Sequence, residues 1–113
     1  MRMSGDIISV RYGAGGPPPP PVSVPAAPSG LSLSARKGSL TLNWTDNANN
    51  EIGFVIERSV NGAGFAQIAQ VGANVRTFTN SGLNKNTSYT YRVRAFNANG
   101  NSAFSNTATG SPR

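Results

Sequence analysis

The sequence predicts an all-β fold, a seven-stranded sandwich of two antiparallel sheets with Greek-key connections. Short segments in which apolar and polar residues alternate recur from about residue 28 to the end of the chain, as strands with one buried face require. Turn residues separate these segments, most clearly Asn61-Gly62 and Asn99-Gly100, which suit hairpin turns with positive φ. No segment of useful length has helical periodicity. Short strands at this spacing are typical of a sandwich.

The chain begins with a short extended arm, residues 1–12, whose second half alternates like a strand. An isolated strand is unstable in water, because its backbone groups and its apolar face need a partner. The arm is therefore either a disordered tail or a strand that adds to a sheet edge on another subunit or a larger assembly. In the second case, the anchoring residues are Ile7, Ile8, Val10 and Tyr12.

Residues 13–27 form a linker rich in glycine and proline. The glycines at its start provide a flexible pivot, and the prolines at 17–21 favour a polyproline II spacer of about 15 Å. An alternative is a ligand for a proline-recognition domain, since Pro25 and Pro28 fit the PxxP pattern. This motif lacks the flanking arginine that such ligands usually carry, which favours the linker.

Residues 28–113 are expected to form the sandwich. The first strand is entered at residues 28–31, and the alternation then predicts strands at 40–44, 54–58, 65–71, 76–79, 89–95 and 103–109. The segment 89–95 has the clearest pattern, because every second residue in it is apolar or aromatic. Alternation assigns a structural core to one face of these strands: Leu42, Trp44, Phe54, Ile56, Tyr89, Tyr91 and Val93.

Composition argues against an enzyme. The chain has no cysteine, no histidine and only four carboxylates, so no catalytic residue, metal site or cofactor site is expected. The net charge is +6, but the basic residues are spread along the chain, and nucleic-acid binding would need them clustered. No segment approaches the roughly 20 apolar residues that span a membrane, so membrane insertion is not expected.

The order of particular residues resembles a known family. Leu42-Asn-Trp44, the segment 51–58 and the segment 82–100 together are similar to a fibronectin type III domain, in a style common in bacterial and phage proteins, over about residues 28–111. The resemblance implies an immunoglobulin-like sandwich. It adds Leu83 to the core and implies a tyrosine corner, in which the Tyr89 hydroxyl bonds to upstream backbone. Lys85 departs from the family, which often has proline there.

Two surface features are candidates for binding. The outward face of one sheet should carry Val55, Glu57, Thr90, Arg92, Arg94 and Phe96. This face is either a solvated surface with an ion pair from Glu57 to Arg92 or Arg94, or a contact surface for glycan or protein formed by Arg92, Arg94 and Phe96. The second feature is the loop at residues 46–51, whose dense oxygen atoms suggest calcium, although its spacing matches no known ligand pattern.

The resemblance implies a non-enzymatic function. We expect a structural and interaction module: a sandwich head on a proline-rich stalk, anchored by the arm to a larger assembly such as a phage virion or cell-surface fibre. Its partner would be another protein or copies of itself. The alternative is a carbohydrate- or surface-binding accessory domain from a secreted bacterial enzyme. The expected location is extracellular or on a virion surface, although the N-terminus lacks the apolar region of a signal peptide.

Overall fold

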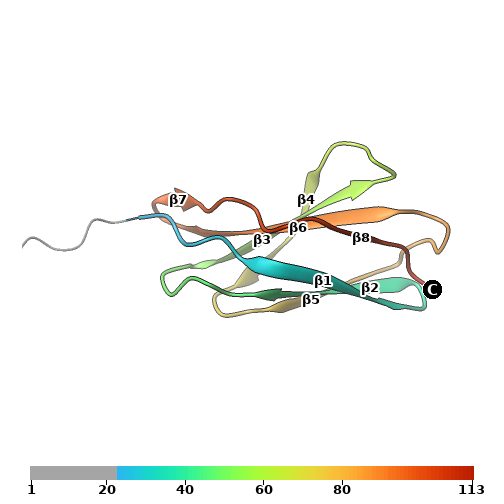
Figure 1. The fold of residues 1–113 in the computed structure, drawn as a ribbon, viewed down its shortest axis with the longest axis horizontal. Coiled ribbons are helices and arrows are strands. Elements are labelled where there is room, and N and C mark those ends of the chain that lie inside the picture. The colour runs from blue at the N-terminus through green and yellow to red at the C-terminus, as the bar shows by residue number, and fades with distance from the viewer. Residues whose placement is uncertain (1–22) are drawn as a thin grey trace, which may run out of the picture.

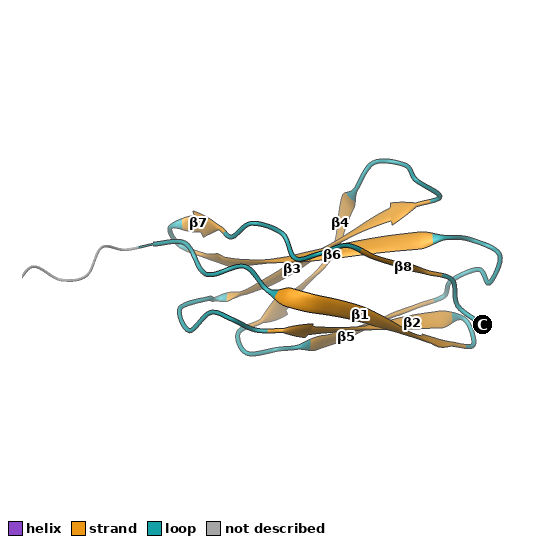
Figure 2. Cartoon of the chain, viewed as in Figure 1, coloured by secondary structure: helices purple, strands orange, loops and turns teal. Residues whose placement is uncertain are grey.

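The computed structural model describes residues 23–113, which form two packed antiparallel sheets (Figure 1). The smaller sheet has the order β1-β2-β5, and the larger has β4-β3-β6-β7, with β8 also paired to β6. The elements are β1 Ser29–Arg36, β2 Ser39–Thr45, β3 Gly53–Val60, β4 Ala66–Gly72, β5 Thr77–Ser81, β6 Tyr89–Asn97, β7 Gly100–Asn101 and β8 Ala108–Gly110. Figure 2 shows strands and loops only over this range. The predicted fold class is confirmed.

Several connections pass from one sheet to the other, so strands that follow each other in sequence do not always pair. β2 pairs with β5, and β3 pairs with β6, so strands distant in sequence become adjacent. This is the Greek-key arrangement expected from the sequence. The β3–β4 hairpin closes with a tight turn in which Asn61 and Gly62 both have positive φ, as predicted. In the β6–β7 turn only Gly100 has positive φ, and the Asn99 N–H donates a hydrogen bond to the Asn97 side chain at 2.8 Å.

The last predicted strand, residues 103–109, differs from the structure. Regular strand occupies only β7 and β8, and residues 102–107 run between them without ladder pairing. In this segment, hydrogen bonds formed by two serines take the place of regular strand pairing. The hydroxyls of Ser102 and Ser105 accept hydrogen bonds from the N–H groups of Ala95 and Val93. Their own N–H groups donate to the carbonyls of the same two residues. The segment therefore stays bonded to β6, although its backbone is not that of a strand.

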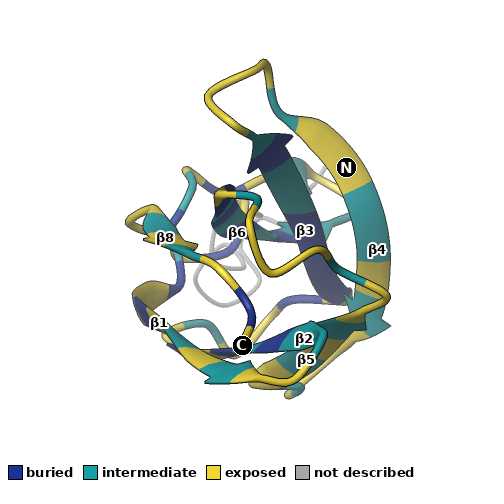
Figure 3. Cartoon of the chain, turned by 90° about the vertical axis from the view of Figure 1, so that its right-hand side faces the viewer, coloured by how far each residue is buried: buried dark blue, intermediate teal, exposed yellow. Residues whose placement is uncertain are grey.

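The core lies between the two sheets, where Figure 3 shows the buried parts of the strands. Seven of the eight residues expected there are buried, and Leu83 is partly buried against them. Trp44 and Phe54 pack with ring centroids 5.7 Å apart. Tyr91 is fully buried, and its hydroxyl donates to Asn80 at 2.6 Å. Burial raises the pKa of the Tyr91 phenol to about 12, so it remains a donor at neutral pH.

The tyrosine corner takes the form that the resemblance implied. The Tyr89 hydroxyl accepts a hydrogen bond from the backbone N–H of Asn84 at 3.1 Å. Lys85 follows directly, at the family position that often holds proline. The bond fixes the crossing from β5 to β6 and contributes about 1 kcal/mol to stability.

The arm, residues 1–12, lies outside the described residues, as does the linker before residue 23. The boundaries proposed for both remain predictions. Over residues 23–113, no helix is long and apolar enough to cross a membrane.

Candidate functional site

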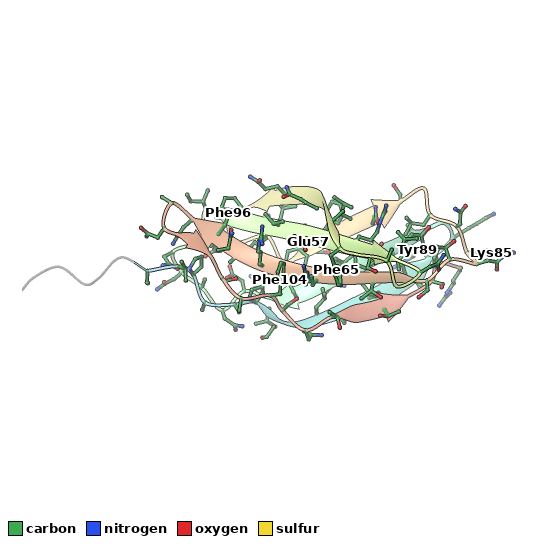
Figure 4. All side chains as sticks on the ribbon, turned by 90° about the horizontal axis from the view of Figure 1, so that it is seen from above. Glu57, Phe65, Lys85, Tyr89, Phe96 and Phe104 are labelled. Atoms are coloured by element: carbon green, nitrogen blue, oxygen red, sulfur yellow. The ribbon has the colours of Figure 1, made fainter. Side chains whose placement is uncertain are left out.

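The outer face of the larger sheet carries an arginine held between two aromatic rings. The guanidinium carbon of Arg92 lies 4.1 Å from the ring centroid of Phe65 and 3.8 Å from that of Phe104. Phe65 precedes β4, whereas Phe104 lies on the segment between β7 and β8, so three separate parts of the chain meet here (Figure 4). Cations are attracted to aromatic ring faces, and the attraction strengthens as water is excluded.

Glu57 supplies the counter-charge. It lies directly opposite Arg92 in the antiparallel register of β3 and β6. One carboxylate oxygen accepts hydrogen bonds from Arg92 Nε at 2.9 Å and from a terminal nitrogen at 2.7 Å. The side chains are 30% and 13% exposed, so the pair is partly shielded from solvent. The sequence left open which arginine Glu57 would meet, and the structure places it against Arg92.

Arg94 is less well hydrogen-bonded than Arg92. Its guanidinium lies 5.1 Å from the Phe104 ring, and its Nε is buried without a hydrogen-bond partner. In register it lies opposite Val55, which was expected on the outward face. Val55 is on that face but only 6% exposed, because a central strand next to large side chains is shielded even on its outer side. The predicted face of Val55 is therefore correct, although its side chain is buried.

Phe96 does not join the arginines. It was expected to share an outward-facing contact surface with them, but it is half-buried at the end of β6 and lies over Gly53. A Cβ atom at Gly53 would lie 3.1 Å and 3.2 Å from carbons of the Phe96 ring. The missing side chain at Gly53 therefore makes room for the ring. Of the three predicted contact residues, Arg92 and Arg94 meet at Phe104, and Phe96 lies apart (Figure 4).

The two carboxyl groups of the loop at residues 46–51, Asp46 and Glu51, affect each other's ionisation. Burial and the hydrogen bond shared with Glu51 raise the pKa of Asp46. Burial alone would raise the pKa of Glu51, but the hydrogen bonds from Asp46 and from the Asn74 N–H outweigh it and lower that pKa. Within residues 23–113, no group of three or more His, Cys, Asp or Glu side chains gathers that could hold a metal ion.

Asparagines of this loop and of the β6–β7 turn hold the end of the linker. The Ser23 carbonyl accepts hydrogen bonds from the side-chain amides of Asn50 at 3.3 Å, Asn97 at 3.0 Å and Asn99 at 3.4 Å. Asn47 donates to the Ala27 carbonyl at 3.0 Å and to a serine hydroxyl of β1. The oxygen-rich loop that suggested calcium therefore uses its amide nitrogens as donors to the linker.

Sequence reasoning missed two groups of residues. Phe65 and Phe104 were assigned to strands, but their stacking on Arg92 depends on segments brought together by the fold. The only signal was Phe104, the one large apolar residue in the stretch 101–109. The asparagine contacts with Ser23 also went unpredicted, since they join positions up to 76 residues apart.

The arrangement suits binding through a surface rather than within a cavity. No pocket opens on the part of the protein that the structure describes. Arg92 between the Phe65 and Phe104 rings combines the residue types, arginine and aromatic, that are enriched where proteins contact partners.

Comparisons with known proteins agree with this architecture. The family model described as "Fibronectin type III domain" matches residues 26–111. No curated protein matches the chain.

Solved structures with a similar fold come from diverse proteins. A structure of titin domains is 26% identical with a TM-score of 0.67, covering 78% of this chain and 32% of that chain. A pectate lyase of Pectobacterium carotovorum is 28% identical with a TM-score of 0.67, over 77% and 27% respectively. A β-1,2-glucanase of Parabacteroides distasonis is 21% identical with a TM-score of 0.68, over 81% and 14%. This chain thus spans about a third or less of each.

Proposed function

Because this chain belongs to the fibronectin type III family, we propose that it is a non-enzymatic display and interaction module. In this proposal the sandwich is a head carried on the proline-rich linker. The arm, with Ile7, Ile8, Val10 and Tyr12, anchors the chain to a larger protein assembly, such as a virion or a cell-surface fibre.

The observation that carries the proposal is the asparagine contact with the linker. Three side-chain amides converge on the Ser23 carbonyl, so the linker meets the head at a defined point. The other terminus lies at the opposite end of the head, where Arg113 forms two backbone hydrogen bonds at the β1–β2 turn (Figure 1). A head joined at one end and held firmly at the junction suits display away from an anchoring surface.

The test is to remove the anchor without changing the head. A variant lacking residues 1–12, and a second in which those residues are replaced by an equally long Gly/Ser segment, are expressed in the source organism. We expect both variants to be lost from the purified assembly, and we expect each to melt at the same temperature as the full chain. Normal incorporation of either variant would refute the anchoring role.

A second candidate function is binding of a carbohydrate or an anionic surface, as an accessory domain. It is supported by Arg94, whose Nε has no partner beside the Phe104 ring. Two of the similar structures are a pectate lyase and a glucanase. The test is a glycan array with the full chain and with Arg94→Ala and Phe96→Ala. Binding that both substitutions weaken would support this function, and an array without signal would exclude it.

A further inference from the structure

The edge of the larger sheet at β4 is open. β4 pairs with β3 on one side only, and Figure 3 shows it at the margin of the molecule. Natural proteins usually protect such edges with charged residues or proline, because unpaired backbone groups otherwise invite another strand. Neither occurs here, since residues 59–75 contain no charged residue and no proline. A bulge opposite Ile56 and Glu57 is the one protective feature, and it leaves the second half of β4 regular.

The same side of the sandwich has an incompletely covered core. Partly buried apolar side chains from the segment of β4 and β5 pack against the core there: Ile68, Ala69, Val71, Val75 and Phe78. The other side is closed, because the Asn106 side chain bonds both the N–H and the carbonyl of Leu31. The sandwich therefore has one sealed side and one side where an added strand would bury further apolar surface.

We propose that β4 accepts residues 6–12 of a second copy of this chain as an added strand. This rests on the proposed function, in which the arm is an anchor, and names its acceptor. The arm has the pattern that the site requires. Its apolar residues Ile8, Val10 and Tyr12 would continue the inward row of β4. Ser9 and Arg11 would lie beside the exposed Gln67 and Gln70 on the outer face.

The linker favours a second copy over the chain's own edge. Residues 23–28 run along the head from β1 to the end where the Ser23 carbonyl is held (Figure 1). The prolines at 17–21 would extend this path by about 15 Å. To pair with its own β4, the chain would have to reverse direction within residues 13–16, and a stiff proline run that leads away from the head opposes this. Because arm and edge are different surfaces, copies would join head to tail.

The first experiment measures self-association of the full chain by sedimentation over a range of concentrations. We expect reversible growth beyond the 11.7 kDa monomer. In an added strand, one of any two consecutive N–H groups faces β4, and proline has no N–H to donate. The double substitution Ser9→Pro/Val10→Pro should therefore weaken the affinity of self-association at least about tenfold. The control Ser9→Thr/Val10→Ile keeps strand-forming residues and should associate like the parent. A chain that stays monomeric at all concentrations would overturn the proposal.

The second experiment locates the acceptor. The chain has no cysteine, so a Ser9→Cys copy and a differently tagged Gln70→Cys copy can be mixed and oxidised. We expect a mixed disulfide between them. Ser34→Cys, exposed on β1 of the other sheet, is the control and should give none. Equal cross-linking to both positions would overturn the assignment to β4. A single chain that carries both Ser9→Cys and Gln70→Cys is oxidised separately. If a disulfide forms within that chain but not between the mixed copies, the arm pairs with its own β4, and the proposal of a second copy is overturned.

The outcomes separate this inference from the proposed function. If removing residues 1–12 abolishes incorporation into the assembly but the chain is monomeric and does not cross-link at Gln70, the arm anchors elsewhere and only this inference fails. If incorporation is unchanged while the copies still associate through β4, only the anchoring function fails.

Discussion

Replacing Arg92 tests whether the arginine between the two rings is part of the fold or free for a partner. In the structure it forms one partly shielded ion pair and two stacking contacts, at 4.1 Å and 3.8 Å. Each contact contributes about 0.5–1 kcal/mol after discounting for exposure. Arg92→Ala should therefore lower the free energy of unfolding by about 2 kcal/mol. For a domain of this size, that corresponds to a melting temperature about 10 °C lower.

The measurement is urea unfolding followed by the fluorescence of Trp44, which is the only tryptophan and is buried. Arg92→Lys keeps the charge but loses the planar stack, so it should cost about 1 kcal/mol. Arg94→Ala is the matched control. It removes one distant ring contact and no ion pair, and should cost less than about 0.5 kcal/mol.

A double-mutant cycle isolates the stack. Arg92→Ala and Phe104→Ala should be coupled by about 0.5–1 kcal/mol. If Arg92→Ala costs no more than Arg94→Ala, and the coupling is absent, the reasoning is refuted. The guanidinium of Arg92 would then be available to a binding partner rather than committed to the fold.

Three further substitutions test particular contacts. Tyr89→Phe removes the acceptor of the Asn84 N–H and should lower unfolding free energy by about 1–2 kcal/mol in urea titrations; no change would mean that water replaces the hydroxyl. Gly53→Ala would drive its methyl group into the carbonyl of the facing β4 strand and into the Phe96 ring, and should cost at least about 2 kcal/mol. Its control Gly64→Ala meets no atom within 4 Å and should be neutral. The pKa of Asp46 is raised in the folded protein, so its contribution to stability is full below its unfolded pKa of about 3.8 and is lost as pH rises through the folded value. Asp46→Asn mimics the protonated form, so its stability relative to the parent should increase from pH 3.5 to pH 7 in thermal melts; a constant difference would contradict the assigned shift.

The sequence by itself determined the fold class, most strands and the core. Alternating residues bury one face of a strand whatever its neighbours are, and segments such as residues 89–95 therefore predict their own structure. Asn61-Gly62 likewise specifies its turn locally, because few other pairs tolerate two positive φ angles. Residues 103–109 were the exception. They alternate weakly, and two serine hydroxyls replace the expected ladder.

Only the tertiary structure decided how the candidate surfaces are built. Nothing near Arg92 in sequence indicates that rings from two other segments enclose it, and the sequence left open whether Glu57 pairs with Arg92 or with Arg94. The same holds for the asparagines on the Ser23 carbonyl and for the open edge of β4. These features depend on which strands become neighbours, and packing between distant segments sets that choice. The alternating pattern that predicts a strand contains no information about which segments will pack beside that strand.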